Sequence, residues 1–214
     1  MTDKLAFYNL TLGHLLEQPL LSLTERSEKR YALDTFYDQV VKEALEAGLW
    51  KFMLRVVKYD ASATLKPDFG FTYGFAIPND WVRTEMVSLD PTFSVPLKEY
   101  AEETGYWYAN STPIYVKFQS NDALYGMNLG EWSGTFTKYA SLLFAEYACG
   151  RVTGATKLLA GPEGISRRLD SAKKKAKSND AMGQPLGQMP TSSWVNSRQG
   201  MGRINGPNGI GLDD

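Results

Sequence analysis

Residues 48–57, GLWKFMLRVV, decide the fold, because the hydrophobic pattern changes its period within them. Before this stretch, apolar residues recur every three or four positions, as on one face of a helix. From Trp50 onward the period is two, so that Trp50, Phe52, Leu54 and Val56 alternate with Lys51, Met53, Arg55 and Val57. A period of two predicts a β-strand with one buried face. A helical section therefore ends here and a β section begins at Trp50.

Two helices are predicted on the N-terminal side of this boundary. The first covers residues near 3–16 and is ended by Pro19, which cannot continue a helix. The second begins after Ser27, a good N-cap residue, and is expected to end at Gly48 in a left-handed conformation. Its apolar stripe contains Val40, Ala44 and Leu45.

Three further β segments are predicted after the boundary, at residues 71–78, 81–89 and 105–119. They are rich in aromatic and β-branched side chains. Turn-forming residues separate them, namely Pro78, Asn79, Asp80, Pro91, Gly105 and Pro113. Short strands joined by tight turns indicate an antiparallel sheet.

The helical period returns after Gly134. A third helix is predicted to continue toward Leu158, with an apolar stripe of Phe136, Ala140, Leu143 and Tyr147. Pro162 is expected to start a fourth helix. One side of that helix carries Ile165, Leu169, Ala172 and Ala176, and the other carries Lys173, Lys174 and Lys177.

This order of helices, strands and helices predicts an α+β fold. We expect one domain over residues 1–182, in which residues 1–49 and 134–182 form a bundle of about four helices. Residues 50–133 form an antiparallel β lobe inserted into that bundle. Residues 183–214 contain many Gly and Pro residues without periodicity, and we expect them to form an extended C-terminal arm.

Composition narrows the function classes. The chain has 214 residues, of which 43% are hydrophobic and 22% charged, with a formal net charge of −1 and a pI near 5.9. A surface devoted to nucleic acid needs clustered Lys and Arg, so any DNA contact is expected to be local. The first residues match neither a signal peptide nor a membrane span, and the single cysteine, Cys149, excludes an internal disulfide.

Few residues suggest catalysis. His14, the one histidine, would have to serve any histidine-dependent triad, but we interpret it as a residue on a helix face. Cys149, among small residues, is interpreted as a buried hydrophobe. Acidic residues are the remaining candidates, and a glycosidase would need two of them as a pair; they are Glu99, Glu102, Glu103 and Asp122. Neither a phosphate-binding glycine loop nor a calcium-loop spacing is present, so we expect no cofactor and no metal.

Two surface features have an alternative interpretation. The lysines at 173, 174, 175 and 177 form the outer side of an amphipathic helix, and they are also candidates for contact with a DNA backbone. On a strand, Tyr106 and Tyr108 face one way and Trp107 the other. Core packing accounts for one face, and the other suggests contact with a neighbouring chain.

The order of these segments resembles the head-to-tail connector, or adaptor, proteins of tailed bacteriophages, including the tail tubular protein A group. The similarity begins in YNLTLGHLLEQPLLSLTERSEKRYALDTFYDQVVKEALEAGLWKF (8–52), with its helix, Ser-Leu connector, long helix and Trp-x-Phe exit. It continues in FAIPNDWVR (75–83), a Pro-x-Asp turn followed by Arg, and in SSWVNSR (192–198). The chain extends further beyond Arg198 than the family pattern does.

The resemblance implies a structural virion protein at the head-tail junction, assembled in the host cytoplasm and without enzyme activity. It would form a dodecameric ring beneath the portal protein, extend the DNA channel and join it to a tail or nozzle protein. Packaged DNA would pass without sequence-specific binding, and no membrane is involved. The C-terminal arm would dock into the portal, for which the candidate residues are Trp194, Asn196, Arg198 and Arg203. Lys173, Lys174 and Lys177 would line the channel, and Tyr106, Trp107 and Tyr108 would face the tail or a neighbouring subunit.

Two other functions stay open. One is a virion-associated cell-wall or polysaccharide hydrolase that uses carboxylates such as Glu102 and Glu103. The other is a soluble DNA-binding module that uses the lysine run.

Overall fold

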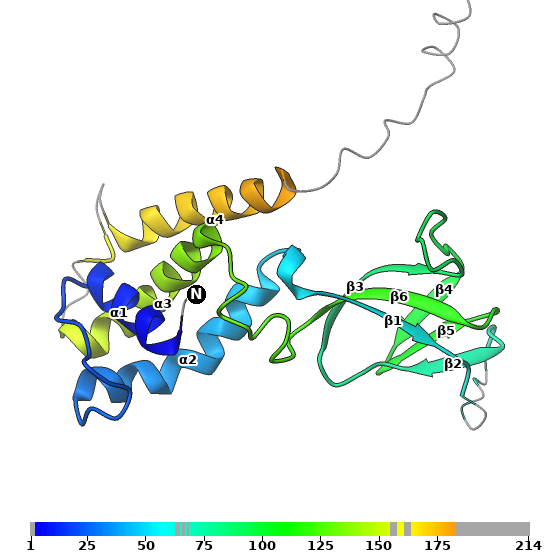
Figure 1. The fold of residues 1–214 in the computed structure, drawn as a ribbon, viewed down its shortest axis with the longest axis horizontal. Coiled ribbons are helices and arrows are strands. Elements are labelled where there is room, and N and C mark those ends of the chain that lie inside the picture. Colours follow the sequence, from blue (N-terminus) through cyan, green and yellow to red (C-terminus); the bar gives the residue numbers. More distant parts are fainter. Residues whose placement is uncertain are drawn as a thin grey trace, which may run out of the picture. The chain divides into compact units, whose positions relative to one another are not determined.

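The computed structural model describes residues 3–62, 65, 67, 69–154, 158–160 and 164–182. The chain divides into two units, Met1–Ala181 and Met182–Asp214, and the account that follows concerns the first. Within the described residues, four helices pack together and six strands form two small antiparallel sheets (Figure 1). The predicted α+β class, with a β section inserted between two pairs of helices, is confirmed.

The helices are α1 (Lys4–His14), α2 (Glu28–Glu46), α3 (Gly134–Thr153) and α4 (Ile165–Met182). Side chains cap three of their N-termini: Asp3 accepts from the N–H of Ala6, Ser27 from Arg30 and Ser133 from Phe136. Each cap satisfies a backbone donor that the first helical turn leaves without an intrahelical partner.

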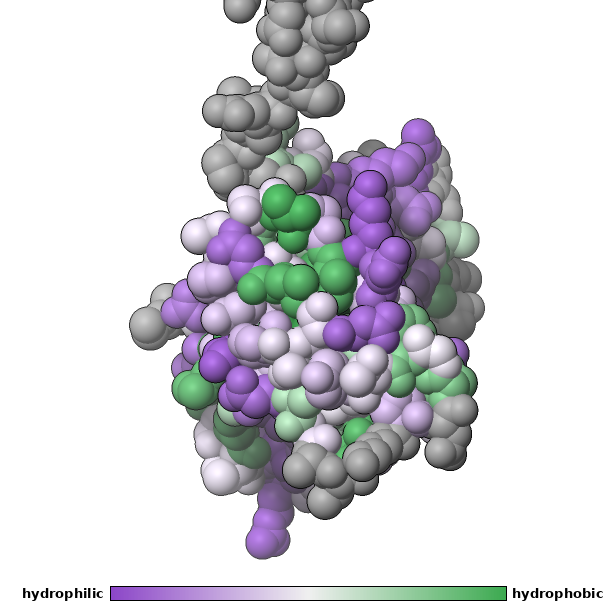
Figure 2. All heavy atoms as spheres, turned by 90° about the vertical axis from the view of Figure 1, so that its right-hand side faces the viewer, coloured by the Kyte–Doolittle hydropathy of each residue, from purple (hydrophilic) through white to green (hydrophobic). Residues whose placement is uncertain are grey.

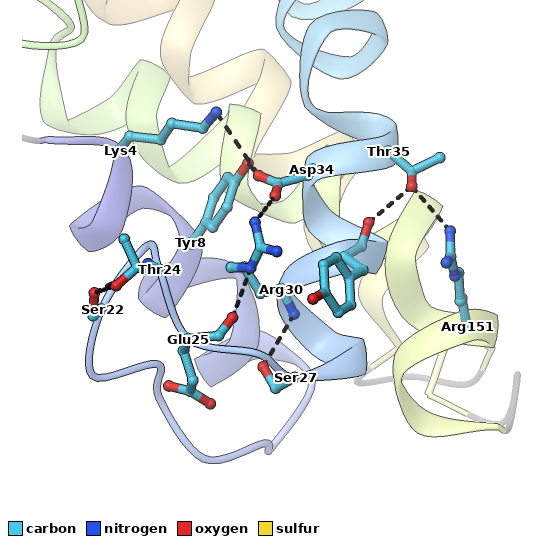
Figure 3. A network of polar contacts seen from close by, with 11 residues as sticks. Lys4, Tyr8, Ser22, Thr24, Glu25, Ser27, Arg30, Asp34, Thr35 and Arg151 are labelled. Carbon is cyan, nitrogen blue, oxygen red and sulfur yellow. Dashed lines mark hydrogen bonds and ion pairs between the residues drawn. The ribbon is translucent and has the colours of Figure 1, made fainter.

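One hydrophobic core holds the four helices together. Its centre is aromatic, since the ring of Phe7 lies 5.4 Å from that of Trp132 and 5.6 Å from that of Phe144. Helix α4 adds the buried side chains of Ile165, Leu169, Ala172 and Ala176, as predicted. Polar contacts reinforce the bundle at its edge (Figure 3). There the Tyr8 hydroxyl donates to Asp34, 2.8 Å away, and Arg151 on α3 bonds to Thr35 on α2 at 3.0 Å.

The six strands form a lobe with a core of its own. Strands β1 (Leu54–Tyr59), β6 (Ile114–Ser120) and β3 (Trp81–Ser88) make one sheet, in that order. Strands β2 (Tyr73–Ala76), β5 (Tyr106–Ala109) and β4 (Tyr100–Glu103) make the other. Both sheets contribute to the core, for example through Trp107 of β5 and Phe118 of β6, whose rings lie 6.1 Å apart.

Polar contacts gather where the chain passes between the bundle and the lobe. Asp80, in the turn before β3, accepts hydrogen bonds from Arg55 of β1, at 2.7 Å, and from Ser120 of β6. Burial alone would raise the pKa of Asp80, but the bonds from Ser120 and Arg55 outweigh it and hold the pKa below its ordinary value. The carboxylate therefore stays ionised and joins three segments that are distant in the sequence.

Several local predictions were wrong. Residues Lys51–Met53 form a 3-10 turn and β1 starts at Leu54, because Trp50 and Met53 both pack into the bundle core. Helix α2 ends at Glu46, its C-cap residue Ala47 is right-handed, and Gly48 does not take the expected left-handed conformation. Helix α3 ends at Thr153, where Gly154 with φ +66° supplies the left-handed cap, and does not reach Leu158. Strand β4 was not predicted, because its Glu-rich sequence looks like a solvated turn.

Candidate functional site

Helix α4 presents the lysines that the sequence singled out. Lys174 and Lys177 are exposed, whereas Lys173 is partly buried and its ammonium lies 6.0 Å from the centre of the Tyr139 ring. Six residues of the helix are basic and two are acidic, so its net charge is +4 in a chain of net charge −1. Among the described residues, none of these three lysines forms an ion pair. Lys174 and Lys177 are thus available to an anionic partner.

Strand β5 divides its aromatic residues between its two faces. Trp107 is completely buried, and its indole N–H donates to the Thr84 hydroxyl, 2.9 Å away. The expectation that Trp107 meets a partner is therefore corrected: this side chain fills the space between the two sheets. Tyr106 and Tyr108 lie on the opposite face with rings 6.2 Å apart and are partly exposed. Whether they contact another chain stays a prediction.

The lobe also exposes aliphatic surface. Figure 2 looks onto the side of the molecule that carries the lobe and shows hydrophobic side chains grouped in the middle of that face, with hydrophilic ones around them. Among the described residues of the lobe, the large hydrophobic side chains that are exposed include Leu89 and Val95, at 47% and 70%. Together with Pro96 and Leu97 they line a cavity of about 430 Å³. Exposed apolar surface of this kind is typical of protein–protein contacts.

The carboxylates considered for glycoside hydrolysis have separate environments. Glu102 and Glu103 are neighbours on β4, and neighbouring side chains of a strand point to opposite faces. Glu102 accepts a hydrogen bond from Trp107, 3.2 Å away, and Asp122 accepts one from the N–H of Leu124 at 2.9 Å. The structure therefore does not turn Glu102 and Glu103 toward one substrate.

His14 has a definite set of partners. Its Nδ1 lies 3.0 Å from the Arg168 guanidinium, and its Nε2 lies 3.1 Å from the Ser141 hydroxyl. Because that hydroxyl donates to the carbonyl of Lys138, 3.0 Å away, it accepts from Nε2–H. Burial and the charges of Arg168 and Lys138 lower the pKa of His14 to about 4. A neutral imidazole that accepts from an arginine joins α1 to α3 and α4, which matches its interpretation as a helix-face residue.

Cys149 lies fully buried in the bundle core, as its sequence environment suggested. Its sulfur is 3.8 Å from the Thr153 hydroxyl. No group of three or more potential metal-binding side chains occurs among the residues that the structure describes. In that same part of the chain, none of the helices combines the length and apolar character needed to cross a membrane.

The predicted docking residues Trp194, Asn196, Arg198 and Arg203 lie outside the described residues. Sequence reasoning also missed contacts that connect distant segments. It noted Asp80 only as part of a turn, although the ion pair with Arg55 joins that turn to β1. It did not single out Lys138 of α3 or Arg168 of α4, which the fold brings together beside a cavity between these two helices. The one local sign of positive charge at this place was the pair Arg167–Arg168, next to the expected apolar position at Leu169.

Comparison with protein-family models gives no match for this chain, and comparison with curated proteins gives none either.

Proposed function

We propose that this chain is a head-to-tail adaptor of a tailed bacteriophage. In this proposal the protein forms a dodecameric ring beneath the portal protein, extends the DNA channel and joins it to a tail or nozzle protein. It acts through surfaces and without catalysis. Its place is the head-tail junction of the virion, after assembly in the host cytoplasm.

The observation that supports this proposal most is the separation of two hydrophobic cores in one continuous chain. The bundle core draws on both ends of the described chain, and the inserted lobe has its own core of Phe75, Trp107, Val116 and others. A joint between two partners needs two distinct surfaces on a common support. A helical bundle for contacts with subunits and portal, and a lobe for contacts with the tail, would meet that need.

Exposed side chains on the lobe and on helix α4 add support. The lobe exposes aliphatic surface around Leu89 and Val95, which suits a protein partner. Helix α4 exposes Lys174 and Lys177, which suit the phosphates of DNA moving past. Contacts to phosphate carry no base information, so such a channel would not select a sequence.

A weakly associating subunit fits the near-neutral charge. With a net charge of −1 the subunits neither repel nor attract one another strongly. We expect the isolated protein to be a monomer or weak oligomer and to form rings mainly on a portal template, since binding to the template shifts the equilibrium by mass action. Light scattering of the isolated protein checks this, and a stable dodecamer at low concentration would contradict it.

Electron microscopy of the protein mixed with portal tests the function itself. The expected result is a second ring that caps the portal on one end. Portal particles that stay uncapped at saturating protein would overturn the adaptor role. A glycan-release assay on the same preparation tests the hydrolase alternative, since turnover that a single carboxylate substitution abolishes would favour an enzyme.

A further inference from the structure

A cavity of about 300 Å³ lies between the first turns of α3 and the middle of α4. Helix α3 lines it with Gly134, Thr135 and Lys138, and helix α4 lines it mainly with Arg168, Ser171 and Lys175. Three of these side chains are cationic and none is acidic. The volume is several times that of one water molecule, which occupies about 30 Å³ in the liquid.

The three cations have no counterion in the described part of the chain, where the ion pairs involve other residues. Lys138 and Lys175 are exposed and Arg168 is partly buried, so water screens part of the repulsion among the three charges. An anion that enters the cavity would relieve the remainder. His14 contacts Arg168 at 3.0 Å but supplies no negative charge, because it is a neutral acceptor. That contact instead fixes the direction of the guanidinium.

Neutral donors complete the lining. Ser133, the N-cap of α3, accepts from the N–H of Phe136, whereas the N–H groups of Gly134 and Thr135 have no acceptor among the described residues. First-turn N–H groups carry partial positive charge and bind oxyanions in many proteins. The Ser171 hydroxyl adds a further donor at the cavity wall.

We propose that this cavity binds a phosphate group, held by Lys138, Arg168 and Lys175. The natural source favoured by the surroundings is the backbone of duplex DNA. The cavity lies on the helix with net charge +4, and Lys174 and Lys177 continue the positive charge beyond it. Attraction by exposed lysines is screened by salt, whereas Arg168, held by His14 at 3.0 Å, gives the cavity one donor of fixed direction. This site stands on its geometry and does not require the adaptor function.

The test compares two double variants of the full chain that remove the same charge from neighbouring positions. Lys138→Gln/Lys175→Gln changes the lining of the cavity, and Lys174→Gln/Lys177→Gln changes exposed lysines of α4 that do not line it. Binding of a labelled duplex of about 20 base pairs is measured by fluorescence anisotropy at several salt concentrations. We expect the cavity variant to lose about tenfold in affinity and the control about threefold or less. Each phosphate contact that is lost should reduce the slope of log affinity against log salt by about one.

Inorganic phosphate is the second probe, read as a shift in melting temperature. Phosphate should stabilise the wild-type chain and the control more than the cavity variant. Phosphate stabilisation without binding of the duplex would support the site and assign it to free phosphate. Equal losses in both variants, or no response to either probe, would overturn the proposal. The unliganded melting temperature of each variant shows whether it is folded.

Discussion

Lys51 carries a buried ammonium group without a hydrogen-bond partner among the described residues. Burying a charged group without compensation costs free energy. Lys51→Met removes the ammonium and keeps an unbranched side chain that is one atom shorter, and the backbone N–H that donates to Asp180 at 3.2 Å is unaffected. We expect the free energy of unfolding to rise by about 1 kcal/mol. Chemical denaturation measures it, and Lys42→Met, at a lysine whose side chain is 73% exposed, is the matched control. A lower stability for Lys51→Met would show that the ammonium has a partner.

His14 gives the bundle a dependence on pH. Its pKa is about 4 in the folded chain, against 6.5 for an ordinary histidine. Between these values the unfolded chain binds one proton more, so stability falls as pH drops from 6.5 to 4 and then levels off. The loss is at most about 3.5 kcal/mol, since one pKa unit corresponds to about 1.4 kcal/mol.

His14→Gln isolates this effect, because an amide can accept from Arg168 and donate to Ser141 but does not titrate. Thermal unfolding between pH 4 and 7 should therefore show a smaller decrease for His14→Gln than for the wild type. Parallel curves for the two proteins would mean that His14 does not supply the dependence.

The 3-10 turn at Lys51–Met53 attaches the lobe to the bundle through Trp50. This side chain is 1% exposed, and its indole N–H donates to the carbonyl of Ala44, 3.1 Å away. Its ring also lies 4.8 Å from that of Phe136. Trp50→Ala should cost about 3 to 5 kcal/mol, as large aromatic truncations in cores do. The neighbouring Leu49→Ala, at a residue 54% exposed, should change the unfolding midpoint little. An unchanged midpoint for Trp50→Ala would contradict its place in the core.

Secondary structure could largely be predicted where the hydrophobic period continues over many residues. It was less predictable near Trp50, where the chain passes from the bundle core to the lobe. The stripe of α4 and the cap at Ser27 follow from local spacing and chemistry. At Trp50, in contrast, alternation predicted a strand, but packing against Phe136 from a distant segment overrides the local preference. The cavity at Lys138 and Arg168 was unpredictable for a related reason. Residues 30 positions apart share it only because α3 and α4 pack together.

At the scale of the whole chain, we expect folding and attachment to the portal to depend on different segments. If the C-terminal segment is the docking arm, removing residues 184–214 should leave the thermal unfolding of the bundle unchanged and abolish stable attachment to the portal. Within the segment, Trp194→Ala and Arg198→Ala should weaken docking more than changes at Gly206–Asp214. Interface aromatics and arginines often contribute about 2 kcal/mol or more. Co-sedimentation with portal measures this, and full docking of the truncated chain would place the joint on the bundle.

The first strand of the lobe and its last are partners in one ladder, with Leu54 opposite Gln119 at the point where both adjoin the bundle. The side-chain amide of Gln119 holds this end of the lobe against the segment before β1. Its oxygen accepts from the N–H of Trp50 at 2.7 Å, and its nitrogen donates to the Gly48 carbonyl at 3.2 Å. An insertion closed in this way keeps a fixed distance between its ends, whatever its length. Evolution or engineering can therefore lengthen, shorten or exchange the far part of the lobe while the gap that the helices must span stays the same.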